Sequence, residues 1–152
     1  MTMTRGLLET LPPEGRARLD GIGREVSMPR GARVFEEGRP ADRFWVIRSG
    51  RVALDQHVPG RRAAVVETVG RGDLLGWSWL FPPYLWHLGA ETESRVEALE
   101  FDAAVVRSLC MSDPVLGREM YRYVAETVID RLHRTRIRLL DLYGPQGSGL
   151  ER

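Results

Sequence analysis

Cysteine, lysine, asparagine and histidine are scarce or absent in this sequence. The 152 residues include one cysteine and three histidines, and neither lysine nor asparagine occurs. A lone cysteine excludes an internal disulfide framework and favours a reducing, cytoplasmic compartment, in which we expect Cys110 to be a small buried hydrophobic residue. His57, His87 and His133 form no pair with the spacing of metal ligands, so no metal site is predicted. We expect His57 and His133 to be exposed to solvent.

Long apolar runs and an excess of charge of one sign are also missing. No stretch approaches the roughly 20 apolar residues that cross a bilayer, and residues 1–16 lack the apolar segment of a signal peptide. The sequence therefore predicts no association with a membrane. Because 22 basic residues oppose 21 acidic ones, for a net charge of +1, the chain also lacks the broad basic face typical of a nucleic-acid-binding domain.

Motifs for catalysis are absent as well. The sequence contains no nucleophile elbow, no phosphate-binding loop and no pair of carboxylates in a catalytic pattern. The neighbours Glu36 and Glu37 are typical of a solvated turn. We predict that the protein has no catalytic residues and is not an enzyme.

The residues that are present predict one domain, over residues 1–143. With 43% hydrophobic residues, the chain can bury a core of its own. Residues 1–22 are typical of short helices. Over residues 23–101, short β-branched runs alternate with glycine and proline at intervals of about 8–12 residues, which predicts a small antiparallel sandwich or barrel. Within it we expect tight hairpins at Ser49–Arg51 and at Pro59-Gly60.

Residues 102–143 are typical of two helices. A short helix is followed by Ser112-Asp113-Pro114, where Ser or Asp caps a new helix and proline suits its first position. A long helix then runs from about 115 to 143. The glycine-rich residues 144–152 are predicted to be a flexible tail.

The long helix carries apolar residues at heptad spacing. Within it, Asp130 and Arg134 are placed as an i,i+4 ion pair. The intervals alternate between four and three residues, as in the seam of a coiled coil, along Tyr121, Ala125, Val128, Leu132, Thr135, Leu139 and Leu142. A second apolar strip follows Val124, Ile129, Ile137 and Leu140. A helix that is apolar on two sides usually has two neighbours, here its own domain and a second copy, so we predict a homodimer through the seam. The alternative is that the seam packs back on the β domain.

Three short motifs occur in the order in which a known family has them. They are Phe35-Glu36-Glu37-Gly38, the aromatic-rich run from Phe44 to Val52, and Gly72-Asp73-Leu74-Leu75-Gly76. Together with the helices on either side, they resemble the cyclic nucleotide-binding domain of the catabolite-activator (Crp/Fnr-like) regulators, over about residues 5–143. The resemblance implies a mainly β fold, in which a β roll of the jelly-roll type with flanking helices is followed by a long C-terminal dimerisation helix.

The phosphate-binding cassette of this family is where the sequence departs from the pattern. In the family, a glutamate after the second glycine holds the ribose, and a later arginine pairs with the cyclic phosphate. Here Trp77 stands in the glutamate's place, residues 78–89 contain no arginine, and Tyr84 falls near the arginine's position. A buried phosphate without a cation is costly. The sequence therefore argues against binding of cyclic AMP or cyclic GMP, and the cofactor stays unknown.

An aromatic stretch from Trp77 to His87 occupies the cassette instead. One interpretation is that these side chains line a pocket for a small, flat, apolar or aromatic ligand; the other is that they fill the pocket and leave a structural interaction module. If the pocket is open, the resemblance implies that the long helix approaches the ligand near Thr135 and Arg136. The candidate ligand-binding residues are Gly76, Trp77, Ser78, Trp79, Tyr84, Trp86, His87, Thr135 and Arg136. In a third alternative, His87 serves a haem-binding sensor or a small β-roll enzyme.

The family's usual output domain is not expected here. Its regulators follow the long helix with a helix-turn-helix domain, whereas about nine residues follow Tyr143, too few for a recognition helix. We therefore expect no direct binding to DNA. The sequence predicts a stand-alone regulatory domain, divergent from cyclic nucleotide binding, that senses a ligand and acts through dimerisation and a protein partner.

Overall fold

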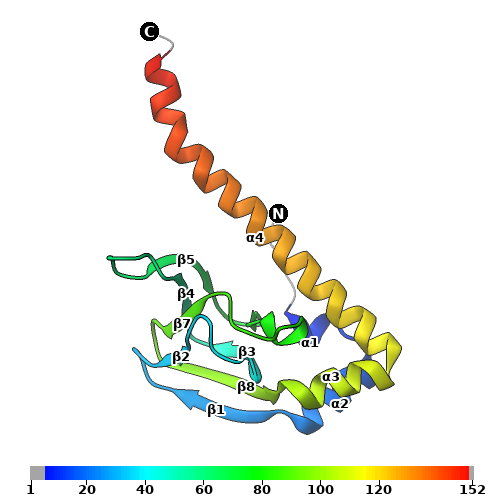
Figure 1. The fold of residues 1–152 in the computed structure, drawn as a ribbon. Helices are drawn as coiled ribbons and strands as arrows, with labels where there is room; N and C mark the ends of the chain where they lie inside the picture. The colour runs from blue at the N-terminus through cyan, green and yellow to red at the C-terminus, as the bar shows by residue number, and fades with distance from the viewer. Residues whose placement is uncertain (1–5, 151–152) are drawn as a thin grey trace.

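The structure, a computed structural model, describes residues 6–150, and the side chains of residues 6–143. Two short helices precede eight strands, and two further helices follow (Figure 1). The elements are α1 (Leu7–Thr10), α2 (Pro13–Ile22), β1 (Arg24–Met28), β2 (Arg33–Phe35), β3 (Arg43–Ser49), β4 (Val52–Gln56), β5 (Ala64–Val69), β6 (Leu74–Leu75), the 3₁₀ helix η1 (Ser78–Leu80), β7 (Gly89–Thr92), β8 (Val96–Asp102), α3 (Ala103–Ser112) and α4 (Pro114–Leu150). The predicted β roll with flanking helices and a long C-terminal helix is confirmed.

The strands form two four-stranded antiparallel sheets. One has the strand order β1-β8-β3-β6 and the other the order β2-β7-β4-β5. In the second sheet Val52 lies opposite Val69, and Leu54 lies opposite Glu67. Because directly opposed residues share a face of the sheet, the buried face that holds these three apolar side chains also holds one acidic side chain, that of Glu67.

Ser49–Arg51 is a corner between the two sheets and not the hairpin predicted above. β3 pairs with β6 and β8, whereas β4 pairs with β5 and β7. Gly50 permits the corner, because its φ is +93° and a Cβ there would lie 2.2 Å from the carbonyl oxygen of Arg95. A short glycine loop suits a hairpin equally well, so its sequence does not separate the two. The predicted turn at Pro59-Gly60 is found, with Gly60 at a φ of +73°.

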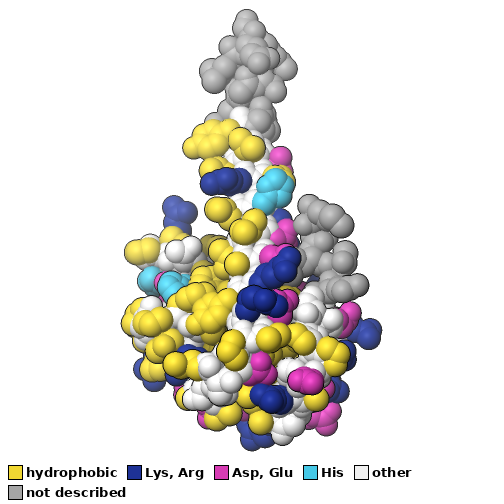
Figure 2. Space-filling model, turned by 90° about the vertical axis from the view of Figure 1, so that its right-hand side faces the viewer, with side chains coloured by type: hydrophobic (Ala, Val, Ile, Leu, Met, Phe, Trp, Pro, Cys, Tyr) yellow, Lys and Arg dark blue, Asp and Glu magenta, His cyan; other side chains and the backbone are white. Residues whose placement is uncertain are grey.

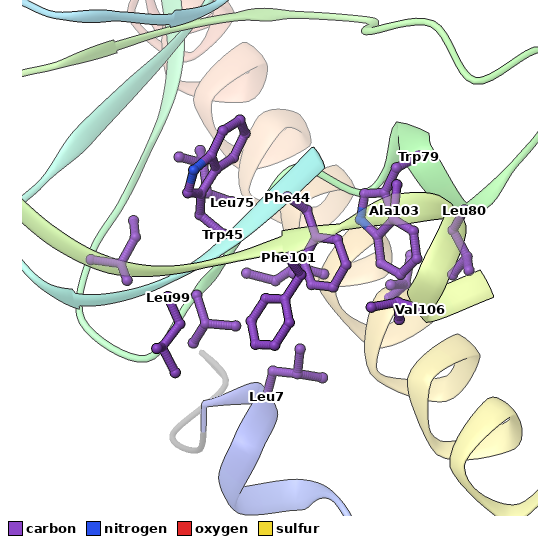
Figure 3. Close-up of a cluster of buried hydrophobic side chains, with 14 of the residues drawn as sticks. Leu7, Phe44, Trp45, Leu75, Trp79, Leu80, Leu99, Phe101, Ala103 and Val106 are labelled. Atoms are coloured by element: carbon purple, nitrogen blue, oxygen red, sulfur yellow. The ribbon is translucent and has the colours of Figure 1, made fainter. Parts of the chain in front are cut away.

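Aromatic stacking ties the first sheet to the helices that cover it. Phe44 of β3 stacks on Trp79 and on Phe101, with ring centroids 4.0 and 5.0 Å apart (Figure 3). Leu7 of α1 and Val106 of α3 are fully buried in the same cluster. The outer layer of helices is therefore fixed to the sheet by one continuous hydrophobic core.

The two C-terminal helices meet at a close crossing. Asp113 caps α4, because its Oδ1 accepts a hydrogen bond of 3.2 Å from the backbone N–H of Leu116. Gly117 lets the helices approach, since a Cβ there would lie 2.5 Å from the carbonyl oxygen of Cys110. Cys110 is buried as predicted, and burial raises the pKa of its thiol to about 11.

Helix α4 projects away from the roll (Figure 1). It begins after Asp113, as predicted, but it continues to Leu150 where a flexible tail was expected over residues 144–152. Once a helix has formed, each further residue adds a hydrogen bond at little cost, which allows the extension over poor helix formers; residues 151–152 lie outside the described part. Within residues 6–150, no helix has both the length and the apolar character needed to cross a bilayer.

Candidate functional site

Part of the aromatic stretch lies in the protein core. Trp86 is 5% exposed and stacks on Phe35 of β2, with ring centroids 3.8 Å apart. Gly76 lies against this indole: its φ is +90°, and a Cβ there would come within 2.5 Å of the ring. Trp45 of β3 lies beside the same pair, with its centroid 5.9 Å from that of Phe35. The cassette region is thus packed with the chain's own aromatic rings.

Trp79 belongs to the core on the other side of the first sheet. It is fully buried against Phe44, and its Nε1–H donates to the carbonyl oxygen of Gly76 at 2.9 Å. Both polar and apolar atoms of this indole are therefore satisfied by the protein. Next to it Arg107 donates to the carbonyl oxygen of Trp79 at 2.7 Å and lies 4.0 Å above the ring of Tyr84. These contacts give Trp79 and Tyr84 structural roles.

The remaining cassette residues form a small cluster near the surface. The ring of His87 stacks on that of Trp77 at 5.6 Å, and its Nδ1 is 2.8 Å from the hydroxyl of Ser78. Phe81 packs edge-on against Trp77 and against Tyr121 of α4, at 6.3 and 5.7 Å. The cassette loop therefore makes direct contact with α4 at the start of the predicted seam.

Two of the predicted site residues lie apart from the others. Thr135 and Arg136 are exposed on α4. The hydroxyl of Thr135 donates to the carbonyl oxygen of Arg131 at 2.8 Å, one turn earlier in the same helix. The structure thus divides the seven candidates between Gly76 and His87 among three sets of contacts, around Trp86, Trp79 and His87, and it does not bring the two helical residues to any of them.

Helix α4 presents different residues to the roll and to solvent. Leu116, Met120, Tyr123 and Val124 are buried against the domain. The seam is turned elsewhere: Leu132 is 49% exposed and its other members are exposed or half-buried along Tyr121, Ala125, Val128, Thr135, Leu139 and Leu142. In the second strip Ile129, Ile137 and Leu140 are also exposed. Figure 2 shows hydrophobic side chains along the projecting length of the helix.

An ion pair with one buried partner, Glu67, joins α4 to the edge strand β5. The side chain of Glu67 is 9% exposed, and its Oε2 accepts hydrogen bonds from Nε and Nη2 of Arg134, at 3.0 and 2.7 Å. Arg134 also donates to Asp130, which confirms the i,i+4 pair predicted above. Arg138 donates to the carbonyl oxygen of Val66. Arg134 and Arg138, one turn apart on α4, therefore both bind β5, and Asp130 on the preceding turn binds Arg134.

A polar cavity of about 220 Å³ adjoins this ion pair, between the β5–β6 connection and α4. Asp73 lies on its strand side, where burial raises the pKa of the carboxyl group. On its helix side, burial lowers the pKa of Arg131 and raises that of Tyr123 to about 12. Arg131 and Arg134 of α4 line this cavity, whereas Thr135 and Arg136 do not.

The histidines do not converge. His57 and His133 are exposed, as predicted, and residues 6–143 contain no cluster of His, Cys, Asp and Glu that could hold a metal ion. His87 is exposed as well, beside Ser78 and Trp77. A haem needs apolar enclosure around its ligand, so the surroundings of His87 do not fit a haem.

Known proteins share this architecture. Residues 25–113 match the model of the family described as "Cyclic nucleotide-binding domain". The chain is 31% identical over 137 residues to the CRP-like cAMP-activated global transcriptional regulator of Mycobacterium tuberculosis, an alignment that covers 90% of this chain and 59% of that protein. The chain therefore spans about three-fifths of the length of this relative.

Two solved structures extend the comparison. The N-terminal domain of a transcriptional regulator from Streptomyces coelicolor A3(2) matches with a TM-score of 0.67 at 26% identity, covering 84% of this chain and 89% of that one. The Catabolite Activator Protein of Thermus thermophilus matches with a TM-score of 0.71 at 20% identity, covering 89% of this chain and 62% of that one. The second likeness is one of fold alone.

Proposed function

The chain belongs to the cyclic nucleotide-binding domain family, and from this premise we propose that it is a regulatory domain that acts as a homodimer through the seam of α4. Its cassette is filled by its own aromatic side chains, so it is divergent from cyclic nucleotide binding. It passes its state to a protein partner through the position of α4 in the dimer. The single unpaired cysteine supports a reducing, cytoplasmic location.

The observation that carries this proposal is the exposed apolar seam. Tyr121, Leu132, Leu139 and Leu142 are each between 47 and 69% exposed. Four large side chains in one row on a projecting helix form an apolar surface that a monomer seldom leaves uncovered. The buried side of the helix is made by other residues, so the seam is free to pair with a second copy in knobs-into-holes fashion.

The packing of the cassette supports the divergent part of the proposal. The buried ring of Trp86 lies in the cassette region, stacked on Phe35. No arginine occurs in residues 78–89 to receive a cyclic phosphate. Titration calorimetry with cyclic AMP and cyclic GMP is expected to show no saturable heat, and micromolar binding of either would overturn this part of the proposal.

The dimer is tested by sedimentation velocity at micromolar concentration. We expect the wild-type chain to sediment as a dimer and Leu132→Asp as a folded monomer, because a carboxylate at the seam cannot be buried without a partner. Met111→Asp is the matched control, since Met111 is 86% exposed on α3 and away from the seam. A wild-type monomer, or a dimer that survives Leu132→Asp, contradicts the proposed interface.

A further inference from the structure

The polar cavity under α4 has the size of a small metabolite. Its volume of about 220 Å³ corresponds to roughly seven water molecules at about 30 Å³ each. The strand side is formed by Thr68, Val69, Asp73 and Leu74, and the helix side by Tyr123, Thr127, Asp130, Arg131 and Arg134. Space for about seven non-hydrogen atoms therefore lies between two segments that are far apart in the chain.

The charges around the cavity include one cation, Arg131, and one anion, Asp73, that form no ion pair in the described part of the chain. Arg134 is already matched by Glu67 and Asp130. The Nε of Arg131 is, by contrast, the one buried side-chain nitrogen or oxygen without a hydrogen-bond partner among the residues that the structure describes. A guanidinium stays charged in a protein, and a buried N–H of such a group that lacks an acceptor is costly.

Asp73 is the corresponding anion. Its Oδ2 accepts a hydrogen bond of 2.8 Å from the backbone N–H of Gly70. The charges of Glu67 and, more weakly, of Asp73 act on Arg131, but Asp73 and Arg131 form no ion pair in the described part of the chain. A half-buried carboxylate and a half-buried guanidinium thus flank a polar space without closing on each other.

We propose that this cavity binds a small zwitterion of the α-amino acid type, with its carboxylate on Arg131 and its ammonium group on Asp73. The main-chain atoms of an amino acid number five, which leaves room for a side chain of about two atoms. A simple anion would match Arg131 but would face the charge of Asp73, and a simple cation would face Arg131. Only a molecule with both charges satisfies both groups with charge-assisted hydrogen bonds.

The cavity lies between the roll and α4, so a bound ligand would affect the position of the helix. This regulatory role rests on the proposed function. A bound amino acid would bridge Asp73, which follows β5, to Arg131 of α4, one turn from the contact between Arg134 and Glu67. It would therefore favour one position of α4 against the roll, and so one arrangement of the seam.

The test is titration calorimetry of the full chain with glycine, alanine, serine, threonine and valine, each at millimolar concentration. We expect at least one of them to bind saturably, while acetate, methylammonium and the larger tryptophan do not. Arg131→Met should weaken that binding roughly tenfold or more, as expected for the loss of a hydrogen bond to a charged group. Asp73→Asn, which keeps the shape of the side chain, should do the same.

Arg122→Met is the matched control, because Arg122 is exposed on α4 and does not line the cavity. It is expected to bind the same amino acid as the wild-type chain does. Absence of saturable binding by the whole panel, or binding unchanged by both Arg131→Met and Asp73→Asn, overturns the proposal and leaves a cavity that holds water only.

Sedimentation of the same samples separates the two proposals. A dimer that binds none of the amino acids refutes the ligand and leaves the dimeric regulatory domain in place. A monomer that binds one of them refutes the dimer and leaves the ligand site in place.

Discussion

Gly76 and Trp86 decide whether the cassette region is open or filled. The glycine adopts a φ of +90°, which side chains with a Cβ rarely tolerate, and its bare Cα lets the indole lie directly against the backbone. The indole in turn covers Phe35. A residue that resembles a family glycine thus serves a different purpose here, the packing of an aromatic side chain.

Gly76→Ala is expected to destabilise the protein by about 2–4 kcal/mol. About 1–2 kcal/mol come from the left-handed backbone, and the rest comes from overpacking, since the new Cβ would lie 2.5 Å from the ring of Trp86. Urea denaturation measures the change. Gly31→Ala is the matched control: its φ is +81° and no atom lies within 4 Å of its Cβ position, so it should show the backbone cost alone. Equal losses in the two variants would contradict tight packing of Trp86.

For the aromatic residues of the cassette, the sequence shows their presence but not their packing partners. The concentration of tryptophan in the cassette and the missing arginine were both visible there. Trp79 and Trp86 became core residues on different sides of the first sheet only through contacts with Phe44 and Phe35. Those partners lie at least 35 residues away in the chain, and no local pattern specifies which ring covers which strand.

At the scale of elements, α4 is held to β5 by the contact between Glu67 and Arg134. This pair spans 67 residues, so nothing local in the sequence announces it. Along α4, Tyr123 is buried and Arg131 is half-buried, whereas Thr135, one turn beyond Arg131, is exposed. The assignment of Thr135 and Arg136 to a ligand site rested on the family's position along the helix, and no local pattern in the sequence shows that Arg131 and Arg134 line the cavity.

Arg134→Leu is expected to cost about 1–2 kcal/mol of unfolding free energy. Loss of one partner leaves the buried Glu67 carboxylate uncompensated, and the value is at the lower end because Arg134 is 34% exposed and screened by solvent. The double variant Glu67→Leu/Arg134→Leu should be more stable than Arg134→Leu alone, since an apolar side chain in place of the carboxylate would pack beside Leu54, which lies opposite it in the sheet. Arg118→Leu, which removes an exposed ion pair with Glu119, is the control and should change stability by less than about 0.5 kcal/mol. A double variant less stable than Arg134→Leu alone would show that Glu67 is satisfied without its arginine.

The loop at Ser49–Arg51 shows that the sequence predicts strands but not the sheet that each strand joins. Strand positions and the glycine turn were predictable from the alternation of residues, and strands occur on both sides of the loop. Which sheet each strand joins is decided by pairing with β8 and β7, which come more than 30 residues later. The order of elements was therefore predictable, whereas the assignment of strands to sheets was available only through the resemblance to a known fold.

At the scale of the whole molecule, the roll and the projecting helix depend on different sources of stability. The roll has its own core, but the outer part of α4 leaves Leu139, Leu140 and Leu142 more than half exposed. An isolated helix of this kind is marginal in water. In the proposed homodimer the partner's helix would supply the missing contacts, so folding of this segment and association would be one event.

The melting temperature of the wild-type chain is therefore expected to rise with protein concentration, because an equilibrium between folded dimer and unfolded monomers shifts by mass action. Scanning calorimetry at two concentrations about tenfold apart measures it. In Leu132→Asp the dependence should vanish, and the far-ultraviolet circular dichroism should lose only the helical signal of the outer part of α4, since the roll keeps its own core. Met111→Asp should behave as the wild type does. A melting temperature that is independent of concentration, together with full helicity in Leu132→Asp, would mean that α4 is stable without a partner and would remove the physical reason for the dimer.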